Sequence, residues 1–402
     1  MYIKFTFLVA VIISGYGCKK EVTSMQSNSN TFFKQYGGVE ADYNSYIGQS
    51  NESGYLMLGS DGAYQSINAS YINDKGHLLW DKKIAVGRNA SLTHALLLDD
   101  GNFLINDRVT AFLTKINTKG EVIFDLPFVV LSNLYLYSKL IESTDKSCYL
   151  AYTDGASQGA PSNSFISEID PNSGDELRYL EYKDASFGGK VINFEVAKTD
   201  GNSFFILGGM YKYKPSWDWS DRMKLFLAKA EGDQVRKVKI FSETDDDVQE
   251  LICGHAALKE GGVVVVSAIT NAIFDGLNFS DPTFSVRKID DDLNVVWSKV
   301  IDLKVNAALP YSIKETYSGD FIITGECENK YKLTGAGFVV RMNNKGEIIE
   351  QKISDLFQGH GFMDAVYTKD NDWLITGSIQ NFGKGMEQSS RFYLKTDKDF
   401  KF

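Results

Sequence analysis

The chain is poor in the residues that define several common protein classes. Of its 402 residues only 6 are Pro, 4 are Cys and 4 are His. So few prolines argue against a proline-rich stalk, and widely spaced cysteines do not form the disulfide framework of a small secreted domain. No CxxC, HxH or HExxH spacing occurs, so the sequence predicts no Cys- or His-based metal site.

The sequence also lacks an excess of positive charge. The 42 basic residues are outnumbered by 52 acidic residues, and the net charge is −10. Nucleic-acid-binding domains carry basic patches, so no nucleic-acid partner is expected. The composition is 43% hydrophobic and 13% aromatic, which excludes general disorder and leaves enough apolar material for a large core.

The longest apolar run, Phe5–Ile13, is interrupted only by Thr6 and is too short to span a membrane. With Lys4 before it, the run has the form of a signal-peptide core, so residues 1–17 are predicted to be a signal peptide. Gly17-Cys18 then resembles a bacterial lipobox, although Gly15 and Tyr16 depart from the usual pattern.

This resemblance implies that Cys18 is the lipidated (palmitate-bearing) N-terminus and that residues 18–30 are a flexible tether. The expected location is the cell envelope of a Gram-negative bacterium, as an outer-membrane lipoprotein facing the periplasm or the surface. The membrane would be contacted only through the lipid. An ordinary secretory signal followed by a chance cysteine is the alternative.

The rest of the chain repeats one unit seven times. A turn followed by a β-rich apolar run recurs near seven anchor positions: Gly54, Gly101, Ser147, Gly201, Gly261, Gly319 and Asn371. After each anchor, a second run enters a polar turn and leaves it again, as in Lys115-INTKGEVIF, which is typical of a hairpin. With a further apolar run before each anchor, every repeat holds four short strands, named a to d.

Seven such units predict an all-β fold: a seven-bladed β-propeller of four-stranded antiparallel blades over residues 31–402. A β-sandwich array would have longer units and a β-helix much shorter ones. The last repeat ends where its strand d should begin, whereas residues 32–37 precede the first strand a. We therefore expect this N-terminal strand to close the ring beside residues 390–397, in a monomeric propeller.

The repeat pattern, D-G-x-Y/F-x-x-x-G followed by K-x-D/N-x-x-G-x-x-x-W, resembles that of secreted bacterial β-propeller lipoproteins. This resemblance implies an envelope-anchored binding or scaffold role and no catalytic residues. The turn from Asn73 to Trp80 also resembles the Asp-box of sialidases, and the spaced Trp resembles quinone-dependent dehydrogenases. Because the turn recurs around Gly120, and basic residues such as Lys115 and Arg341 recur at one repeat position, both features are interpreted as structural.

His94, His255 and Asp364 fall near the same position of strand a, the innermost strand of a blade. We expect them to line the central channel, where they could hold a ligand or could simply be polar side chains in water. Asp245–Asp247 and Asp290–Asp292 form acidic turns that do not match a calcium loop. No cofactor is predicted, with a loosely held calcium ion as the alternative.

The loops between strands b and c are almost absent in blades 1 and 2 and are expected to be long in blades 3 to 7, over 153–164, 210–222, 270–283, 325–336 and 378–389. Loop variation on a rigid scaffold often marks a binding face. The richest of these loops is 210–222. Its candidate ligand-binding residues are Tyr211, Tyr213, Trp217, Asp218, Trp219 and Asp221.

Aromatic rings beside carboxylates suit a glycan, and they equally suit an envelope protein partner. A binding or scaffold lipoprotein is therefore the first hypothesis. A propeller enzyme acting on glycans, either a hydrolase or a lyase, is the second hypothesis. A pair of carboxylates about 5–10 Å apart on the long-loop face would favour the enzyme.

Overall fold

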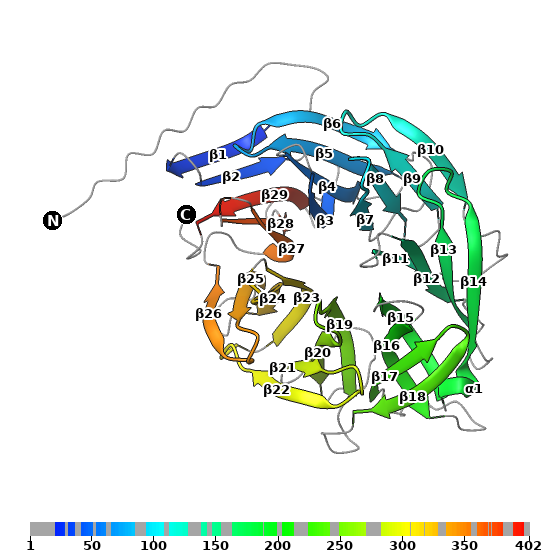
Figure 1. Cartoon of the computed structure of the whole chain (residues 1–402). Coiled ribbons are helices and arrows are strands. Elements are labelled where there is room, and N and C mark those ends of the chain that lie inside the picture. Colours follow the sequence, from blue (N-terminus) through cyan, green and yellow to red (C-terminus); the bar gives the residue numbers. More distant parts are fainter. Residues whose placement is uncertain are drawn as a thin grey trace.

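A computed structural model shows seven antiparallel sheets arranged around a common axis (Figure 1). The described residues are 21–28, 31–36, 42–50, 54–61, 66–84, 94–107, 112–127, 138–142, 147–153, 163–187, 189–198, 203–212, 224–241, 249–270, 283–305, 307–316, 318–328, 335–354, 360–368, 370, 372–380 and 389–397.

Each blade holds its strands in chain order from the axis outward, except the last, which also takes strands from the N-terminal part of the chain. Blade 1 contains β3 (Asp42–Gln49), β4 (Gly54–Asp61), β5 (Ile67–Asn73) and β6 (Leu78–Ile84); blade 2 contains β7 (His94–Leu97), β8 (Phe103–Asn106), β9 (Phe112–Ile116) and β10 (Val122–Pro127); blade 3 contains β11 (Ser138–Glu142), β12 (Cys148–Thr153), β13 (Asn163–Ile169) and β14 (Glu176–Lys183), followed by the short helix α1 (Asp184–Phe187).

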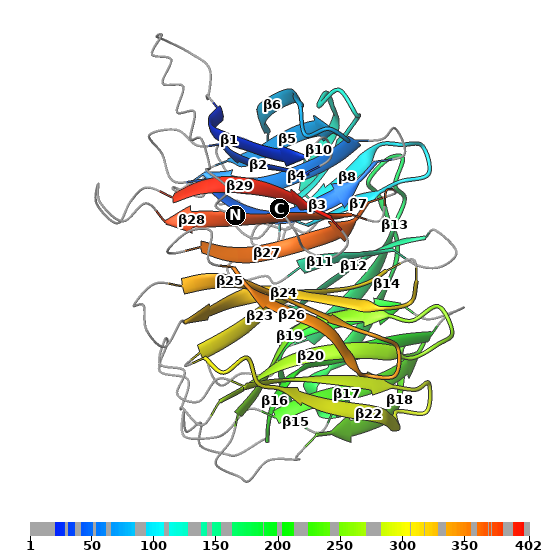
Figure 2. The same cartoon turned by 90° about the vertical axis from the view of Figure 1, so that its left-hand side faces the viewer.

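Blade 4 contains β15 (Gly189–Lys198), β16 (Ser203–Lys212), β17 (Lys224–Glu231) and β18 (Gln234–Ile240); blade 5 contains β19 (Gln249–Ala257), β20 (Val263–Thr270), β21 (Thr283–Ile289) and β22 (Val295–Ile301); blade 6 contains β23 (Ala307–Glu315), β24 (Phe321–Glu328), β25 (Gly335–Met342) and β26 (Ile348–Ile353); blade 7 contains β27 (His360–Tyr367), β28 (Trp373–Gln380), β29 (Ser389–Thr396), β2 (Thr31–Tyr36) and β1 (Glu21–Asn28). Strands β27 and β28 run roughly perpendicular to the plane of the ring (Figure 2), whereas the outer strands β6, β10 and β14 follow its circumference, as the twist of propeller blades requires.

The ring is closed by β2, which pairs with β29 from Phe32↔Lys395 to Tyr36↔Arg391. The prediction that residues 32–37 complete the last blade is confirmed for 32–36, residue 37 lying outside the described residues, and Figures 1 and 2 show the blue N-terminal strands beside the red β29. One difference concerns residues 21–28, which were expected to belong to a flexible tether. They form β1, a fifth strand that pairs with β2.

The apolar core is divided into seven clusters, one for each seam between neighbouring blades. Val264 and Val266 of β20 pack toward blade 6, whereas Val263 and Val265 pack toward blade 4. Because both faces of a middle strand are buried, the strand becomes a continuous apolar run rather than an alternating one.

At two seams the Trp that follows a c–d turn packs on the c–d turn of the next blade. Trp80 of blade 1 donates its indole N–H to Thr118 O at 2.8 Å, and its ring lies over Gly120 in the turn of blade 2. Trp297 of blade 5 meets Gly346 of blade 6 in the same way. A Cβ at either glycine would touch the indole ring. The turn therefore packs against the indole ring of the preceding blade. This confirms the interpretation of the turn and its aromatic residue as structural.

The recurring basic position of strand c serves the fold as well. Lys115 contacts Asp100 at 2.7 Å in blade 2, and Arg341 contacts Asp320 at 2.7 Å in blade 6. Each pair ties strand c to the a–b turn of its own blade. In blade 5, Asp290 accepts the backbone N–H groups of Asp292 and Asn294, so its carboxylate closes the acidic turn that was considered for calcium.

The b–c connections differ from the expected lengths. Strands b and c are separated by 62–66 and 107–111 in blades 1 and 2, and by 154–162, 213–223, 271–282, 329–334 and 381–388 in blades 3 to 7. Blade 6 is the main correction, because β24 runs to Glu328 and β25 begins at Gly335. Much of the expected loop 325–336 is therefore paired strand. Within the described residues, no helix is long and apolar enough to cross a membrane.

Candidate functional site

One register position of the inner strands recurs in all seven blades. In each blade, one residue of strand a pairs with the residue that lies three places after the first apolar residue of strand b; in blade 2, for example, His94 pairs with Asn106, three places after Phe103. The seven strand a residues are Tyr46, His94, Lys139, Glu195, Gly254, Ser312 and Asp364. His94 and Asp364 are thus equivalent, whereas His255 lies one residue further along its strand. In β3, β15, β19, β23 and β27 a β-bulge precedes this position.

Asp364 binds three blades together. Its carboxylate accepts the hydroxyl of Ser312 at 2.7 Å and the ammonium of Lys314 at 2.7 Å, both from blade 6. It also accepts the backbone N–H of Ile47, in blade 1, at 3.1 Å. Lys314 in turn lies over the ring of Tyr46, and that ring packs edge-on against His94.

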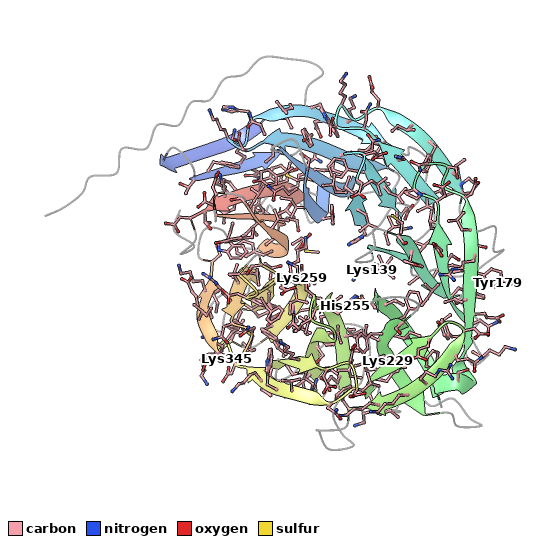
Figure 3. The ribbon with its side chains drawn as sticks, viewed as in Figure 1. Lys139, Tyr179, Lys229, His255, Lys259 and Lys345 are labelled. Carbon is pink, nitrogen blue, oxygen red and sulfur yellow. The ribbon has the colours of Figure 1, made fainter. Side chains whose placement is uncertain are left out.

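Glu195 of blade 4 likewise connects three blades, because its contacts come from blades 3 and 5. Its carboxylate contacts Lys139 Nζ at 3.0 Å and His255 Nδ1 at 2.7 Å, and the other ring nitrogen of His255 lies 3.0 Å from Val196 O. Burial, and then the Lys139 ammonium, lowers the pKa of His255. Figure 3 shows Lys139 and His255 beside the ring axis, while Tyr179 and Lys345 lie on the outer circumference.

These contacts occupy both nitrogens of His255 and both oxygens of Asp364. Groups with so many protein partners hold the inner strands in place and have little capacity left for a ligand. No group of three or more His, Cys, Asp and Glu side chains suited to a metal ion gathers anywhere in the described part of the chain.

A more open polar group lies at the seam between blades 6 and 7. Tyr311, the bulge residue of β23, hydrogen-bonds to Glu326 near the end of β24. Glu326 and Glu328 are both exposed and are alternate residues of one strand, so they project from the same side. Gly361 of β27 leaves the space for this pair, because a Cβ there would lie 2.8 Å from Glu326 Oε2 and 3.7 Å from the Tyr311 ring.

The electrostatics of this group are unlike those of the axial clusters. Partial desolvation raises the pKa of Glu326, and the nearby Glu328 carboxylate raises it further, against the lowering effect of the Tyr311 hydrogen bond. The pKa of Tyr311 is also raised, first by burial and then by the charge of Glu326. No described cation is paired with Glu326. Carboxylates with perturbed pKa values that face solvent are typical of binding and catalytic sites.

Thr324 adds a buried polar atom to the same side of β24. Its side chain is 1% exposed, and its hydroxyl has no hydrogen-bond partner within the described residues. Ile322, on the same side of the strand, packs against Phe362 and Trp373 of blade 7, so this side faces the seam. We call Tyr311, Thr324, Glu326, Glu328 and Gly361 the seam site.

The seam site lies on the face that was expected to bind. The ends of strands b and the starts of strands c share one face of the ring, and Glu326 and Glu328 are at the end of a strand b. Of the residues expected to bind in blade 4, Tyr211 belongs to β16, where its Cα partner is Lys190. Tyr213, Trp217, Asp218, Trp219 and Asp221 lie outside the described residues, as do Cys18 and Asp245–Asp247.

Sequence reasoning missed the seam site. Glu326 and Glu328 were assigned to a loop, and Tyr311 was not singled out. The available signal was the pair of glutamates at alternate positions after the apolar part of strand b, where the other repeats have no such pair.

Solved structures with this fold include several proteins named for action on glycans. The chain resembles the polysaccharide lyase Uly1 with a TM-score of 0.56 and 10% identity, covering 88% of this chain and 90% of that one. An oligogalacturonate lyase in complex with manganese gives a TM-score of 0.54 and 12% identity, covering 94% and 97%. An α-L-arabinofuranosidase of Fusarium graminearum with arabinobiose gives 0.50 and 12%, covering 76% and 92%.

At these identities the likeness shows the fold alone. No protein-family model and no curated protein sequence matches this chain. The class established by the fold is therefore a seven-bladed β-propeller whose structural neighbours include glycan-acting lyases and hydrolases.

Proposed function

We propose that this protein is an envelope-anchored propeller that binds a glycan on the face carrying the seam site. The observation that carries the proposal is the exposed Glu326 carboxylate, which is held by Tyr311 and has Glu328 beside it. Carboxylates accept hydrogen bonds from sugar hydroxyls, and an aromatic side chain offers a flat surface to a sugar ring. The glycan-related names of the structural neighbours support this ligand class over a protein partner.

The aromatic loop of blade 4 belongs to the same proposal. Trp217 and Trp219 are proposed to stack on the glycan, with Asp218 and Asp221 as polar contacts. The change Trp217→Ala with Trp219→Ala is then expected to weaken binding and leave the melting temperature unchanged. A sharp fall in melting temperature with intact binding would show instead that these rings cover the blades.

The envelope location rests on the sequence alone. Cys18 is proposed to carry the lipid, as in the bacterial propeller lipoproteins that the repeat resembles. The position of β1 is compatible with this, because only two residues separate Cys18 from Glu21. The propeller would then be held close to its membrane.

Glycan binding is tested by screening the Cys18→Ser protein on a glycan array, followed by calorimetry with the best ligand. Glu326→Gln and Tyr311→Phe are expected to weaken binding about tenfold or more, as for loss of a charged hydrogen bond. The matched control is Glu181→Gln, an exposed glutamate on the outer strand β14. Absence of any glycan ligand, or equal affinity of all four proteins, would contradict the proposal.

A glycan hydrolase is the second candidate. Glu326 and Glu328 are two residues apart on a strand, which spaces their Cα atoms by roughly 7 Å, and the raised pKa of Glu326 suits a proton donor. Release of reducing ends from the array ligand, abolished in both Glu326→Gln and Glu328→Gln, would establish hydrolysis. Binding without release would leave the protein a binding module.

A further inference from the structure

The charges around the seam site bear on the kind of sugar it accepts. Two carboxylates, Glu326 and Glu328, face solvent there. A sugar that carries its own carboxylate would need a cation beside it in order to bind. Two lysines of the inner strands are already engaged: Lys314 with Asp364 at 2.7 Å, and Lys139 with Glu195 at 3.0 Å. Lys330 and Lys332, which follow Glu328 in the sequence, lie outside the described residues.

The hydrogen-bonding groups of the site point in the same direction. Ionised carboxylates can only accept hydrogen bonds, so they require a ligand that donates. The Thr324 hydroxyl lies on the same side of β24, where it is buried in the seam beneath the two carboxylates and has no partner within the described residues. Neighbouring sugar hydroxyls donate and accept at short spacing, which matches this combination. The carboxylate of a uronate accepts hydrogen bonds as well, so it cannot form them with the carboxylates of Glu326 and Glu328.

We infer that the seam site binds an uncharged sugar unit through its hydroxyls and discriminates against uronates. This inference rests on the proposed glycan binding and adds the substrate class. It gives Glu326 and Glu328 a role in specificity as well as in affinity, since the same two charges that accept hydroxyls repel a sugar carboxylate.

The test uses matched oligosaccharides that differ only at C6, where a hydroxymethyl group replaces the carboxylate: galactose and galacturonate, glucose and glucuronate, mannose and mannuronate oligomers. For the pair whose backbone is bound, the wild-type protein is expected to bind the uncharged member about tenfold more tightly, the factor for one pair of like charges roughly 10 Å apart near a protein surface. The doubly changed protein, Glu326→Gln with Glu328→Gln, should lose most of this preference. Glu181→Gln should keep it.

Three outcomes separate the two proposals. Equal or tighter binding of the uronate member by the wild-type protein overturns the inference, as does a preference for the uncharged member that survives in the double variant. Either result leaves glycan binding intact. If neither the matched pairs nor the wider array gives binding, glycan binding itself fails and the inference fails with it. Thermal melting of each variant confirms that it is folded.

Discussion

An ion pair with its arginine fully buried joins the last blade to the first. Arg391 of β29 is fully buried, and its guanidinium lies 2.5 Å from Asp81 Oδ1 on β6 of blade 1. Asp81 retains 17% exposure and also accepts the hydroxyl of Ser70 at 2.7 Å. In Arg391→Met this carboxylate loses its counter-charge. Removing one partner of a buried ion pair lowers the free energy of unfolding by about 3–5 kcal/mol. Because Asp81 is partly exposed, we expect a loss near the lower end of this range, about 3 kcal/mol.

Urea unfolding of the wild type and Arg391→Met measures this cost, and hydrogen exchange locates it. Because Arg391 pairs with Tyr36 in the β2–β29 ladder, β2 amides should exchange faster. The control is Arg178→Met, whose side chain is 50% exposed beside Glu168 and should cost less than about 1 kcal/mol. A loss below about 1 kcal/mol for Arg391→Met would refute the role of this pair, because a cost that small is typical of an exposed ion pair.

Three shorter predictions concern other parts of the chain. Gly346→Ala should lower the free energy of unfolding in urea more than Gly101→Ala does. Both glycines have φ 79°, but only a Cβ at Gly346 would meet the Trp297 ring, at 2.8 Å. Equal losses of unfolding free energy would contradict the packing between blades. Because the pKa of Glu326 is raised in the folded protein, its protonated form stabilises the fold at acidic pH, and this stabilisation is lost as pH rises through that pKa. Gln cannot ionise, so Glu326→Gln should melt at a higher temperature than the wild type at pH 7. Below about pH 4, near the ordinary glutamate pKa, the two melting temperatures should be equal. A pH-independent difference would contradict that reasoning. Cys18→Ser should move the protein from the membrane fraction to the soluble fraction, and unchanged fractionation would exclude the lipid anchor.

The architecture was readable from the sequence because its signals are local and repeated. Gly120 and Trp80 belong to the same turn motif in successive blades, and the repeat count follows from such turns without any long-range information. Ring closure by residues 32–37 was also predictable, because one repeat lacked its last strand. The pairing of β1 was not, since residues 21–28 have the polar composition of a tether and only the free edge of β2 turns them into a strand.

The candidate site was far less accessible to sequence reasoning. Asp364 and His255 attract attention as polar residues in inner strands, yet their hydrogen-bond partners come from other blades and show them bracing the ring. Tyr311 and Glu326 meet only because a β-bulge and the missing side chain of Gly361 coincide at one seam. Such a meeting depends on the packing of blades 6 and 7, which no single repeat encodes.

A crystal structure of the protein with its tightest array ligand will decide whether the seam site holds a sugar. We expect a sugar ring against Tyr311, with hydroxyl groups within hydrogen-bonding distance of Glu326 and Glu328. A sugar bound on the opposite face of the ring, or elsewhere with the seam site free of sugar, would contradict it.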